Sequence, residues 1–339
     1  RGFARGRRLA GLGREEHGGH LKPFFFVQMA DPQLGMEDSF RDRAQQQQGW
    51  GKELELLRLA VEEVNRLRPA FAIVCGDLIN EWPAEESGRN GVDEGARQGQ
   101  DRDFKEAIQK VHADIPLLCL CGNHDIGNRP NAITIRNFVE SFGDDYFSFW
   151  CHGVKCLVVN SQLWKDDTDA KELRQEMDRW LDAELAEAAD GSASSGVKRP
   201  LLVFSHIPPF VFDPDEKDEY FNLDLAFRGR LLQRLVASGA TAWFCGHYHR
   251  NAGGLYRDKQ GRTLEVVVTG AVGVQIKDKE GGEPLGLSGI GEVDISEEVS
   301  GLRLVRVLAD GRVEHEWHSF TSLRAAQPPN GGSDSSGGG

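Results

Sequence analysis

Six residues with side chains suited to binding metal ions each follow an apolar run of the sequence: Asp31, Asp77, Asn123, His206, His247 and His249. When such runs form the strands of an open α/β sheet, the carboxyl ends of the strands share an edge at which ligand sites form. Carboxylate, amide and imidazole ligands can hold two cations about 3.5–4 Å apart, and such a pair stabilises both oxygens of an in-line phosphoryl displacement. The sequence therefore predicts a two-metal phosphoesterase in which Asp77 bridges the ions.

Each of these residues also has an ordinary structural interpretation. An Asp after a Gly, as at Gly76-Asp77, is usually part of a turn or caps a helix. A single histidine such as His206 is frequently part-buried without any ligand role, and residues at alternate positions, such as His247 and His249, share one face of many solvated strands. Five strand ends that carry such residues in one order are difficult to explain by turns alone, so the joint pattern favours the metal site.

Near-continuous apolar runs, typical of strands buried on both faces, precede the candidate ligands and recur later in the chain. The predicted strands are 23–29, 70–75, 115–121, 155–160, 201–204, 241–245 and 264–269. Helical spacing of apolar residues predicts helices over 51–67, 104–112 and 171–189. Strands that alternate with helices indicate a largely parallel central sheet, and 301–320 is expected to add a hairpin around Asp310-Gly311.

The two ends of the chain differ in composition from its middle. Residues 1–22 are rich in Arg and Gly, and residues 325–339 are rich in Gly and Ser. Neither end has a periodic apolar pattern, so both are expected to be disordered. One folded domain is then expected over 23–324, with the polar stretches 85–100 and 191–198 as surface insertions.

The motifs around the candidate ligands resemble those of the calcineurin-like metallophosphoesterases, in the order typical of that family. The matching strings are Gly76-Asp77, Gly122-Asn123-His124-Asp125, Ser205-His206 and Gly246-His247-Tyr248-His249. Longer strings that resemble one branch of the family more closely are 30–33 (ADPQ), 143–150 (GDDYFSFW), 218–223 (DEYFNL) and 246–254 (GHYHRNAGG). The resemblance covers 24–320. It implies an α/β fold, a four-layer α/β/β/α sandwich with two sheets face to face, and a phosphoserine/phosphothreonine protein phosphatase activity.

The same resemblance implies a cofactor of two divalent metal ions, with Mn, Mg, Fe and Zn all left open. Carried over residue by residue, one ion would be bound by Asp31, Asp77 and His249, and the other by Asp77, Asn123, His206 and His247. Metal-activated water would attack the phosphorus, and His124 would donate a proton to the leaving alkoxide, for which an imidazole has a suitable pKa. Asn123 and Arg250 are the candidate substrate-binding residues, although most arginines on a surface bind no ligand.

Two residues depart from the pattern of the family. The family usually has a histidine two residues after the first aspartate, whereas here Gln33 follows Asp31 at that spacing. A glutamine can coordinate only through its neutral carbonyl oxygen, which should weaken the first site and favour Mg²⁺ or Mn²⁺ over iron. Asn80 stands where the protein-phosphatase motif has the aspartate that orients the catalytic histidine, so His124 is expected to use another carboxylate, either Asp125 or one from a loop.

Charge and hydropathy limit the expected partners. The formal net charge of −13 would repel a polyanion, so a phosphorylated protein is the expected substrate and nucleic acid is not an expected partner. No run approaches the ~20 apolar residues that span a bilayer, so a cytoplasmic location without membrane association is expected. Two other functions stay open: a phosphodiesterase acting on small nucleotides or other diesters, and a binding scaffold whose weakly bound metal does not support turnover. No oligomeric state is predicted.

Overall fold

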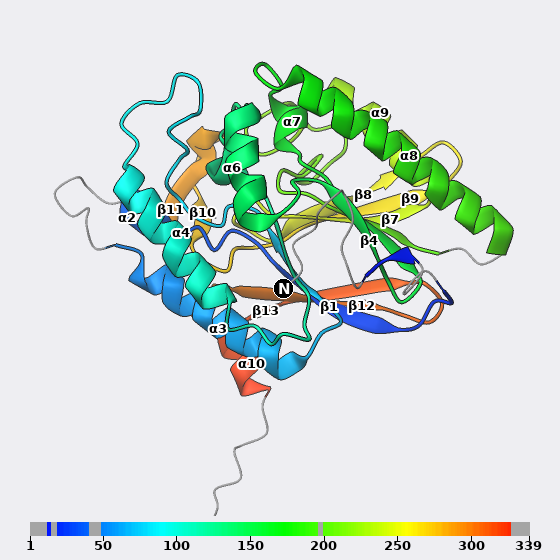
Figure 1. Ribbon diagram of the computed structural model, residues 1–339, viewed down its shortest axis with the longest axis horizontal. Coiled ribbons are helices and arrows are strands. Elements are labelled where there is room, and N and C mark those ends of the chain that lie inside the picture. Colours follow the sequence, from blue (N-terminus) through cyan, green and yellow to red (C-terminus); the bar gives the residue numbers. More distant parts are fainter. Residues whose placement is uncertain (1–11, 15–18, 41–48, 196–198, 327–339) are drawn as a thin grey trace, which may run out of the picture.

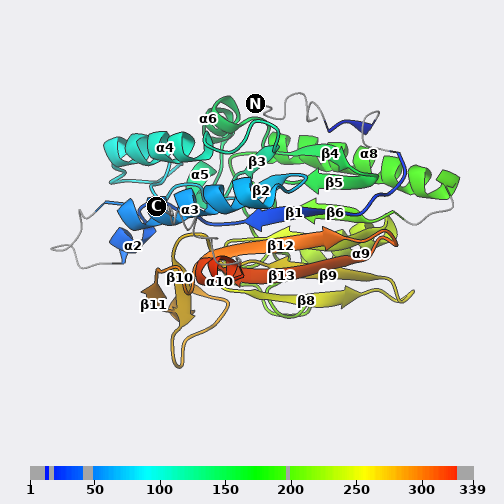
Figure 2. The same cartoon turned by 90° about the horizontal axis from the view of Figure 1, so that it is seen from below.

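Two β-sheets lie face to face, and helices cover their outer faces (Figure 1, Figure 2). A computed structural model describes residues 12–14, 19–40, 49–195 and 199–326, and for 189–195 it describes the backbone alone. The five-stranded sheet, in the order β13-β12-β1-β2-β3, consists of β1 (Phe24–Met29), β2 (Ala72–Cys75), β3 (Leu117–Leu120), β12 (Gly301–Val307) and β13 (Val313–Ser319). The six-stranded sheet, in the order β4-β5-β6-β7-β9-β8, consists of β4 (Phe147–Cys151), β5 (Val154–Val158), β6 (Leu201–Phe204), β7 (Ala240–Cys245), β8 (Ala252–Arg257) and β9 (Thr263–Val268).

Helices form the two outer layers. The described helices are α2 (Met36–Ser39), α3 (Gly51–Leu67), α4 (Glu94–Ile108), α5 (Asn123–Ile126), α6 (Ala132–Phe142), α7 (Gln162–Lys165), α8 (Lys171–Ser195), α9 (Leu225–Ala237), a 3₁₀ turn η1 (Leu287–Gly289) and α10 (Phe320–Ala325). In Figure 1, α8 and α9 lie over the six-stranded sheet, and α3 and α10 lie under the five-stranded sheet. A separate two-stranded ribbon consists of β10 (Gln275–Asp278) and β11 (Ile290–Asp294). The four-layer α/β/β/α arrangement implied by the resemblance is confirmed.

The space between the two sheets is filled by aromatic side chains that alternate along the strands. The ring of Phe26 stacks on Phe71 of its own sheet at 4.6 Å between centroids, and it meets Phe204 and Phe244 of the other sheet edge-on at 5.6 and 5.5 Å. The neighbouring Val27 packs instead in the core under the helices. Since each aromatic pair adds about 0.5–1.5 kcal/mol beyond area burial, this layer fixes the position of one sheet against the other.

The parallel strands of both sheets end on the same side of the molecule. β1, β2 and β3 are parallel neighbours in one sheet, and β5, β6, β7 and β9 are parallel neighbours in the other. The apolar pattern alone predicted one largely parallel sheet, and this expectation is wrong. Two mixed sheets are present because β12 joins β1 antiparallel, while β4 and β8 add antiparallel edges to the second sheet. The pattern did not predict β4, β8, β10 or β11 as strands.

The predicted helix bounds are confirmed in one place and wrong in another. The helix over 51–67 is present as α3 with the same bounds. The helix predicted over 104–112 begins much earlier, as α4, because Asp93 caps it by accepting a hydrogen bond from the Ala96 amide at 2.9 Å. Residues 94–100 of the expected insertion 85–100 are therefore helical. Its polar composition reflects a helix that is buried on one side only.

The disorder predicted for the two ends of the chain does not extend to every residue in them. Leu12 is buried in the core between the sheets, and its carbonyl oxygen accepts a hydrogen bond from the Trp150 amide at 2.8 Å. At the other end, α10 includes Ala325 and buries Leu323. Most other residues of the two predicted segments lie outside the described part of the chain.

Candidate metal centre

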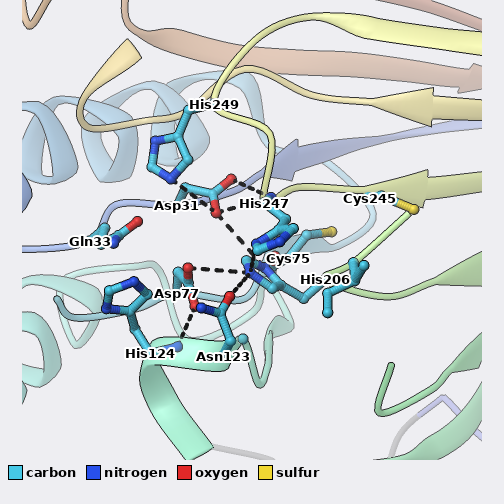
Figure 3. Close-up of polar contacts among 12 residues, drawn as sticks. Asp31, Gln33, Cys75, Asp77, Asn123, His124, His206, Cys245, His247 and His249 are labelled. Carbon is cyan, nitrogen blue, oxygen red and sulfur yellow. Dashed lines mark hydrogen bonds and ion pairs between the residues drawn. The ribbon is translucent and has the colours of Figure 1, made fainter. Parts of the chain in front are cut away.

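The six predicted ligands meet at the side of the molecule where the parallel strands of both sheets end (Figure 3). Asp31, Asp77 and Asn123 follow β1, β2 and β3, whereas His206 follows β6, and His247 and His249 follow β7. All six side chains are buried. Burying so many polar groups costs free energy unless each finds a partner, so their gathering at one point indicates a bound charge.

Three of the ligands converge on a ring nitrogen of a fourth, His206. Nε2 of His206 lies 3.2 Å from Oδ2 of Asp77, 3.0 Å from Oδ1 of Asn123 and 3.1 Å from Nδ1 of His247. Asp77, His206 and His247 thus form a group whose candidate ligand atoms all lie within 4.8 Å of one another. A divalent cation at this point would be within reach of an oxygen from Asp77 and from Asn123 and of a ring nitrogen from His206 and from His247.

The orientation of two of the imidazoles is set by backbone carbonyl groups. Nδ1 of His206 donates to the Cys75 carbonyl at 2.8 Å, and Nδ1 of His249 donates to the Val274 carbonyl at 2.7 Å. A carbonyl oxygen only accepts, so in both rings Nδ1 carries the proton and Nε2 is directed into the site. Metal-bound histidines are usually held in this way.

A second group consists of Asp31, Asp77 and His249, which also bring candidate ligand atoms within 4.8 Å of one another. Nε2 of His249 lies 3.7 Å from Oδ1 of Asp31. Gln33 is close by: its Nε2 donates to Oδ1 of Asn80 at 3.1 Å, and its buried Oε1 has no hydrogen-bond partner among the described residues. In Figure 3 this oxygen is on the side of Gln33 that faces Asp31. An unpaired buried acceptor there fits a weak neutral ligand of a cation.

Backbone strain is concentrated in the ligands themselves. Of the seven non-glycine residues with left-handed backbone in the described part of the chain, five lie at the site: Asp31 (φ 51°), Gln33 (φ 36°), Asp77 (φ 50°), His247 (φ 70°) and His249 (φ 54°). Non-glycine residues in that region cost on the order of 1–3 kcal/mol each and persist where the surroundings enforce them. The backbone conformation that directs these side chains inward therefore lowers the stability of the fold.

Two glycines permit the close approach of the ligand loops. Gly76 has φ 82°, and a Cβ atom there would lie 2.5 Å from Nδ1 of His206. A Cβ at Gly246 would lie 2.7 Å from Oδ2 of Asp31. Any side chain at either position would separate the loops that carry the ligands, so both positions require glycine for a steric reason.

The electrostatics of the buried groups favour a cation. Burial raises the pKa of Asp31 well above its ordinary value. Burial alone would also raise the pKa of Asp77, but the nearby His206 and His124 outweigh it and lower that pKa. Burial disfavours the charged form of His206, yet the adjacent Asp77 carboxylate reverses the effect and raises its pKa to about 9. A divalent ion would allow both carboxylates to ionise and would displace the proton of His206.

His124 is held beside Asp77 by three contacts. Its backbone amide donates to Oδ1 of Asp77 at 2.9 Å, its Nδ1 donates to the Asn80 carbonyl, and its ring packs against the tilted ring of Trp82 at 3.9 Å between centroids. The expectation that Asp125 or a loop carboxylate orients His124 is therefore wrong. Asn80 supports the ring through its backbone carbonyl, which any residue at that position provides.

Asp125 instead supports the backbone around the ligands. Its carboxylate accepts hydrogen bonds from the Gly122 amide at 2.7 Å and the Leu78 amide at 3.1 Å. Arg97 closes the same turn by donating to the carbonyl groups of Asp125 at 2.8 Å and His124 at 3.1 Å. Burial raises the pKa of Asp125 to about 7. These bonds fix the loops after β2 and β3 against each other.

Comparison with known proteins agrees with this geometry. Residues 26–251 match the family model described as calcineurin-like phosphoesterase. The chain belongs to the calcineurin-like phosphoesterase family. It is therefore a metallophosphoesterase, a class of hydrolases that uses divalent metal ions, and the family predicted from the motifs is confirmed.

Relatives of this calcineurin-like phosphoesterase match nearly its whole length. The protein of Danio rerio named serine/threonine-protein phosphatase CPPED1 is 37% identical over 324 residues, which cover 94% of this chain and 92% of that protein. The Homo sapiens protein of the same name is 36% identical over 325 residues, covering 94% and 91%. These relatives confirm the branch of the family that the longer strings indicated.

Among solved structures, purple acid phosphatase PPD1 from yellow lupin (Lupinus luteus) is similar with a TM-score of 0.56 at 12% identity, covering 93% of this chain and 54% of that chain. At such low identity the likeness supports the fold alone. No helix in the described part of the phosphoesterase is long and apolar enough to cross a membrane.

Arg250 lies beside the ligand histidines but is directed at the two-stranded ribbon. Its Nε lies 3.1 Å from Oδ1 of Asp278, and its guanidinium donates to the Lys277 and Gly289 carbonyl groups at 3.4 and 3.3 Å and packs over the Tyr248 ring at 4.4 Å. It thus anchors the ribbon to the loop that carries His249. Its contact with a substrate phosphate stays a prediction.

Two residues near the centre are not among the site residues predicted from the sequence. Trp82 lies between the ring of His124 and the guanidinium of Arg89, which packs over the indole at 3.8 Å. Tyr220 contacts two of the ligands, Asn123 and His247. Tyr220 belongs to the 218–223 string that indicated the branch, so a signal existed, but an aromatic residue in a loop is more often packed in the core.

Proposed function

We propose that this chain is a phosphomonoesterase with two divalent metal ions that removes phosphate from phosphoserine or phosphothreonine in proteins. The observation that carries the proposal is the pair of ligand groups that share Asp77, next to a half-buried histidine, His124. The names of the relatives support the choice of substrate. Two bound cations would polarise the phosphoryl group and acidify a water molecule.

The residues of the chain would hold the ions and the proton donor in place. Asp31, Asp77, Gln33 and His249 are assigned to one ion, and Asp77, Asn123, His206 and His247 to the other. His124 is assigned to the leaving group: its Nδ1 is held by a carbonyl, which leaves Nε2 to carry the transferred proton. Burial lowers the pKa of His124, whereas the negative charge of a bound phosphate would favour its protonated form.

The test uses the purified chain with Mn²⁺ and three substrates: an aryl phosphate monoester, a phosphoserine peptide and an aryl phosphate diester. We expect hydrolysis of both monoesters and slower hydrolysis of the diester. His124→Ala should lower kcat by about 10²–10⁴-fold, as expected for loss of a general acid, without loss of bound Mn²⁺. His112→Ala, which changes an exposed histidine outside the site, is the matched control.

Equal rates in His124→Ala and the unchanged protein would remove the assignment of His124. Faster turnover of the diester would favour the phosphodiesterase alternative, and less than one equivalent of Mn²⁺ per chain would favour the scaffold.

A cytoplasmic location belongs to the same proposal. It is supported by the six cysteines, all of which are free and buried thiols of the kind that persist in reducing compartments.

A further inference from the structure

Tyr220 connects two ligands of the same ion through different atoms. Nδ2 of Asn123 donates to the Tyr220 hydroxyl at 3.2 Å, and Nε2 of His247 donates to the Tyr220 carbonyl at 3.4 Å. The Tyr220 ring also packs against the His247 ring at 5.0 Å between centroids. Tyr220 therefore engages the atom of each ligand that points away from the site, Nδ2 of Asn123 and Nε2 of His247. Oδ1 of Asn123 and Nδ1 of His247 are left directed into the site.

The hydroxyl of Tyr220 decides which end of the Asn123 amide faces the ion. An asparagine side chain has one oxygen that can bind a cation and one NH₂ group that cannot. While the NH₂ group donates to the Tyr220 hydroxyl, Oδ1 lies next to His206, at 3.0 Å from its Nε2. Without the hydroxyl, rotation of the amide by half a turn would direct N–H groups at the cation.

The loop that carries Tyr220 is itself fixed by the half-buried ammonium group of Lys165. Nζ of Lys165, at the end of α7, donates to the Glu219 and Asn222 carbonyl groups, each at 2.7 Å. The side chain of Asn222 adds hydrogen bonds to the Lys217 carbonyl at 2.9 Å and to the Glu219 amide at 2.9 Å. The Lys165 side chain therefore holds backbone carbonyl groups on both sides of Tyr220. This fixes the position of the Tyr220 hydroxyl relative to Asn123.

We propose that Tyr220 is a positioning residue for the ion held by Asp77, Asn123, His206 and His247. The inference rests on the two-metal site of the proposed function and adds to it a residue that binds neither the metal nor the phosphate. It acts by setting the rotation of the Asn123 amide and the His247 ring. Outer residues that orient metal ligands typically contribute 10–100-fold to metal affinity.

The test measures Mn²⁺ binding by titration calorimetry on the full chain after removal of metal by a chelator. Tyr220→Phe removes the hydroxyl and keeps the ring and the backbone carbonyl. We expect one of the two Mn²⁺ equivalents to bind about tenfold more weakly, while the other is unchanged. Tyr256→Phe is the matched control, because it removes the hydroxyl of a half-buried tyrosine in β8, outside the site.

A double-mutant cycle separates positioning from general support of the fold. In the Asn123→Ala background there is no amide to orient, so Tyr220→Phe should have no further effect on Mn²⁺ affinity. Lys165→Met, which releases the loop, should weaken the same equivalent as Tyr220→Phe. Unchanged affinity in Tyr220→Phe, equal weakening of both equivalents, or additive effects with Asn123→Ala would each overturn the proposal. Since no substrate is present, an inactive protein would leave this test intact.

Discussion

Gln33 stands where the motif typical of the family is expected to have a histidine, and its contacts indicate what the difference does. Its amide nitrogen donates a hydrogen bond to Oδ1 of Asn80, whereas its buried oxygen has no hydrogen-bond partner among the residues that the structure describes. A buried unpaired oxygen costs about 1–3 kcal/mol, which a cation near Asp31 would offset. The ion of Asp31, Asp77 and His249 should therefore be present but weakly held.

Substitution of Gln33 tests this interpretation. Gln33→Glu adds a charged oxygen at the same reach and should tighten one Mn²⁺ equivalent, whereas Gln33→Leu keeps the approximate volume and should weaken the same equivalent by about tenfold. Graded addition of a chelator, followed by metal analysis, should remove this ion first in the unchanged protein. Gln162→Leu, at a buried glutamine outside the ligand set, controls for loss of a buried amide.

Two outcomes would contradict the prediction for Gln33. If both ions leave together at every chelator concentration, the two sites are not unequal in the way that their ligands suggest. If neither substitution changes Mn²⁺ affinity, the oxygen of Gln33 does not reach the metal, and its lack of a partner is an unrelated cost in free energy.

At the scale of a single element, α3 contains a carboxylate that the fold buries close to the metal-bearing loops. Glu53 is almost fully buried, and its Oε1 accepts a hydrogen bond from the Glu37 amide of α2 at 2.9 Å. Burial raises the pKa of Glu53, although the bond from Glu37 opposes this. Burial thus disfavours the ionised form of Glu53 in the folded protein, whereas in the unfolded chain water solvates the carboxylate and Glu53 ionises at its ordinary pKa.

The pH dependence of stability follows from that shift. The contribution of Glu53 to the free energy of unfolding is most favourable below the pKa of an unfolded glutamate, about 4.3. This contribution is lost as the pH rises through the higher pKa that Glu53 has in the folded protein. Glu53→Gln keeps an acceptor for Glu37 and removes the charge. Urea unfolding should show the variant more stable by up to about 1 kcal/mol at pH 8 and little different at pH 4.5. Glu55→Gln, exposed on the same helix, should show no such trend.

The elements that carry the ligands could be predicted from the sequence because the core imposes its pattern on them. Strands buried on both faces are apolar throughout in β2 and β6, so the first polar side chain after each of these runs marks the edge of the sheet. The exposed strands β8, β10 and β11 have no such pattern, since edge positions tolerate glycine and charged residues. The start of α4 depends on one capping aspartate, Asp93, in a polar segment.

Within the site, the residues that would bind the metal could be predicted from the sequence, but the contacts that hold them in place could not. The pairing of Asp31 with His249, and of Asn123 with His206, follows from the family motifs. The support of His124 comes from the carbonyl of Asn80, and every residue has a carbonyl, so no residue type could indicate it. Long-range contacts such as Asn123 with Tyr220 depend on how a loop folds over the sheet edge, which local sequence does not specify.

At the scale of the whole molecule, the two sheets make a single rigid support for a highly charged reaction. Ligands from both sheets meet only if the aromatic layer between them keeps the sheets in register, so the metal centre depends on contacts such as Phe26 with Phe204 and Phe244. The centre is also embedded in a chain with a formal net charge of −13. Bound metal ions would therefore attract a phosphate locally, while the remaining surface repels anions at longer range.

This balance predicts opposite salt effects for substrates of opposite charge. Raising the ionic strength from about 0.01 M to about 0.1 M shortens the Debye length from about 30 Å to about 10 Å, which screens the surface more than the buried metal centre. For a phosphoserine peptide flanked by acidic residues, kcat/KM should rise about threefold, and for one flanked by lysines it should fall by a similar factor, mostly through KM. A small aryl phosphate monoester, which has no flanking charged residues, is measured in parallel and corrects for salt effects on the chemical step. Salt effects of the same sign on both peptides would show that a local basic surface, rather than the net charge, governs the approach of the substrate.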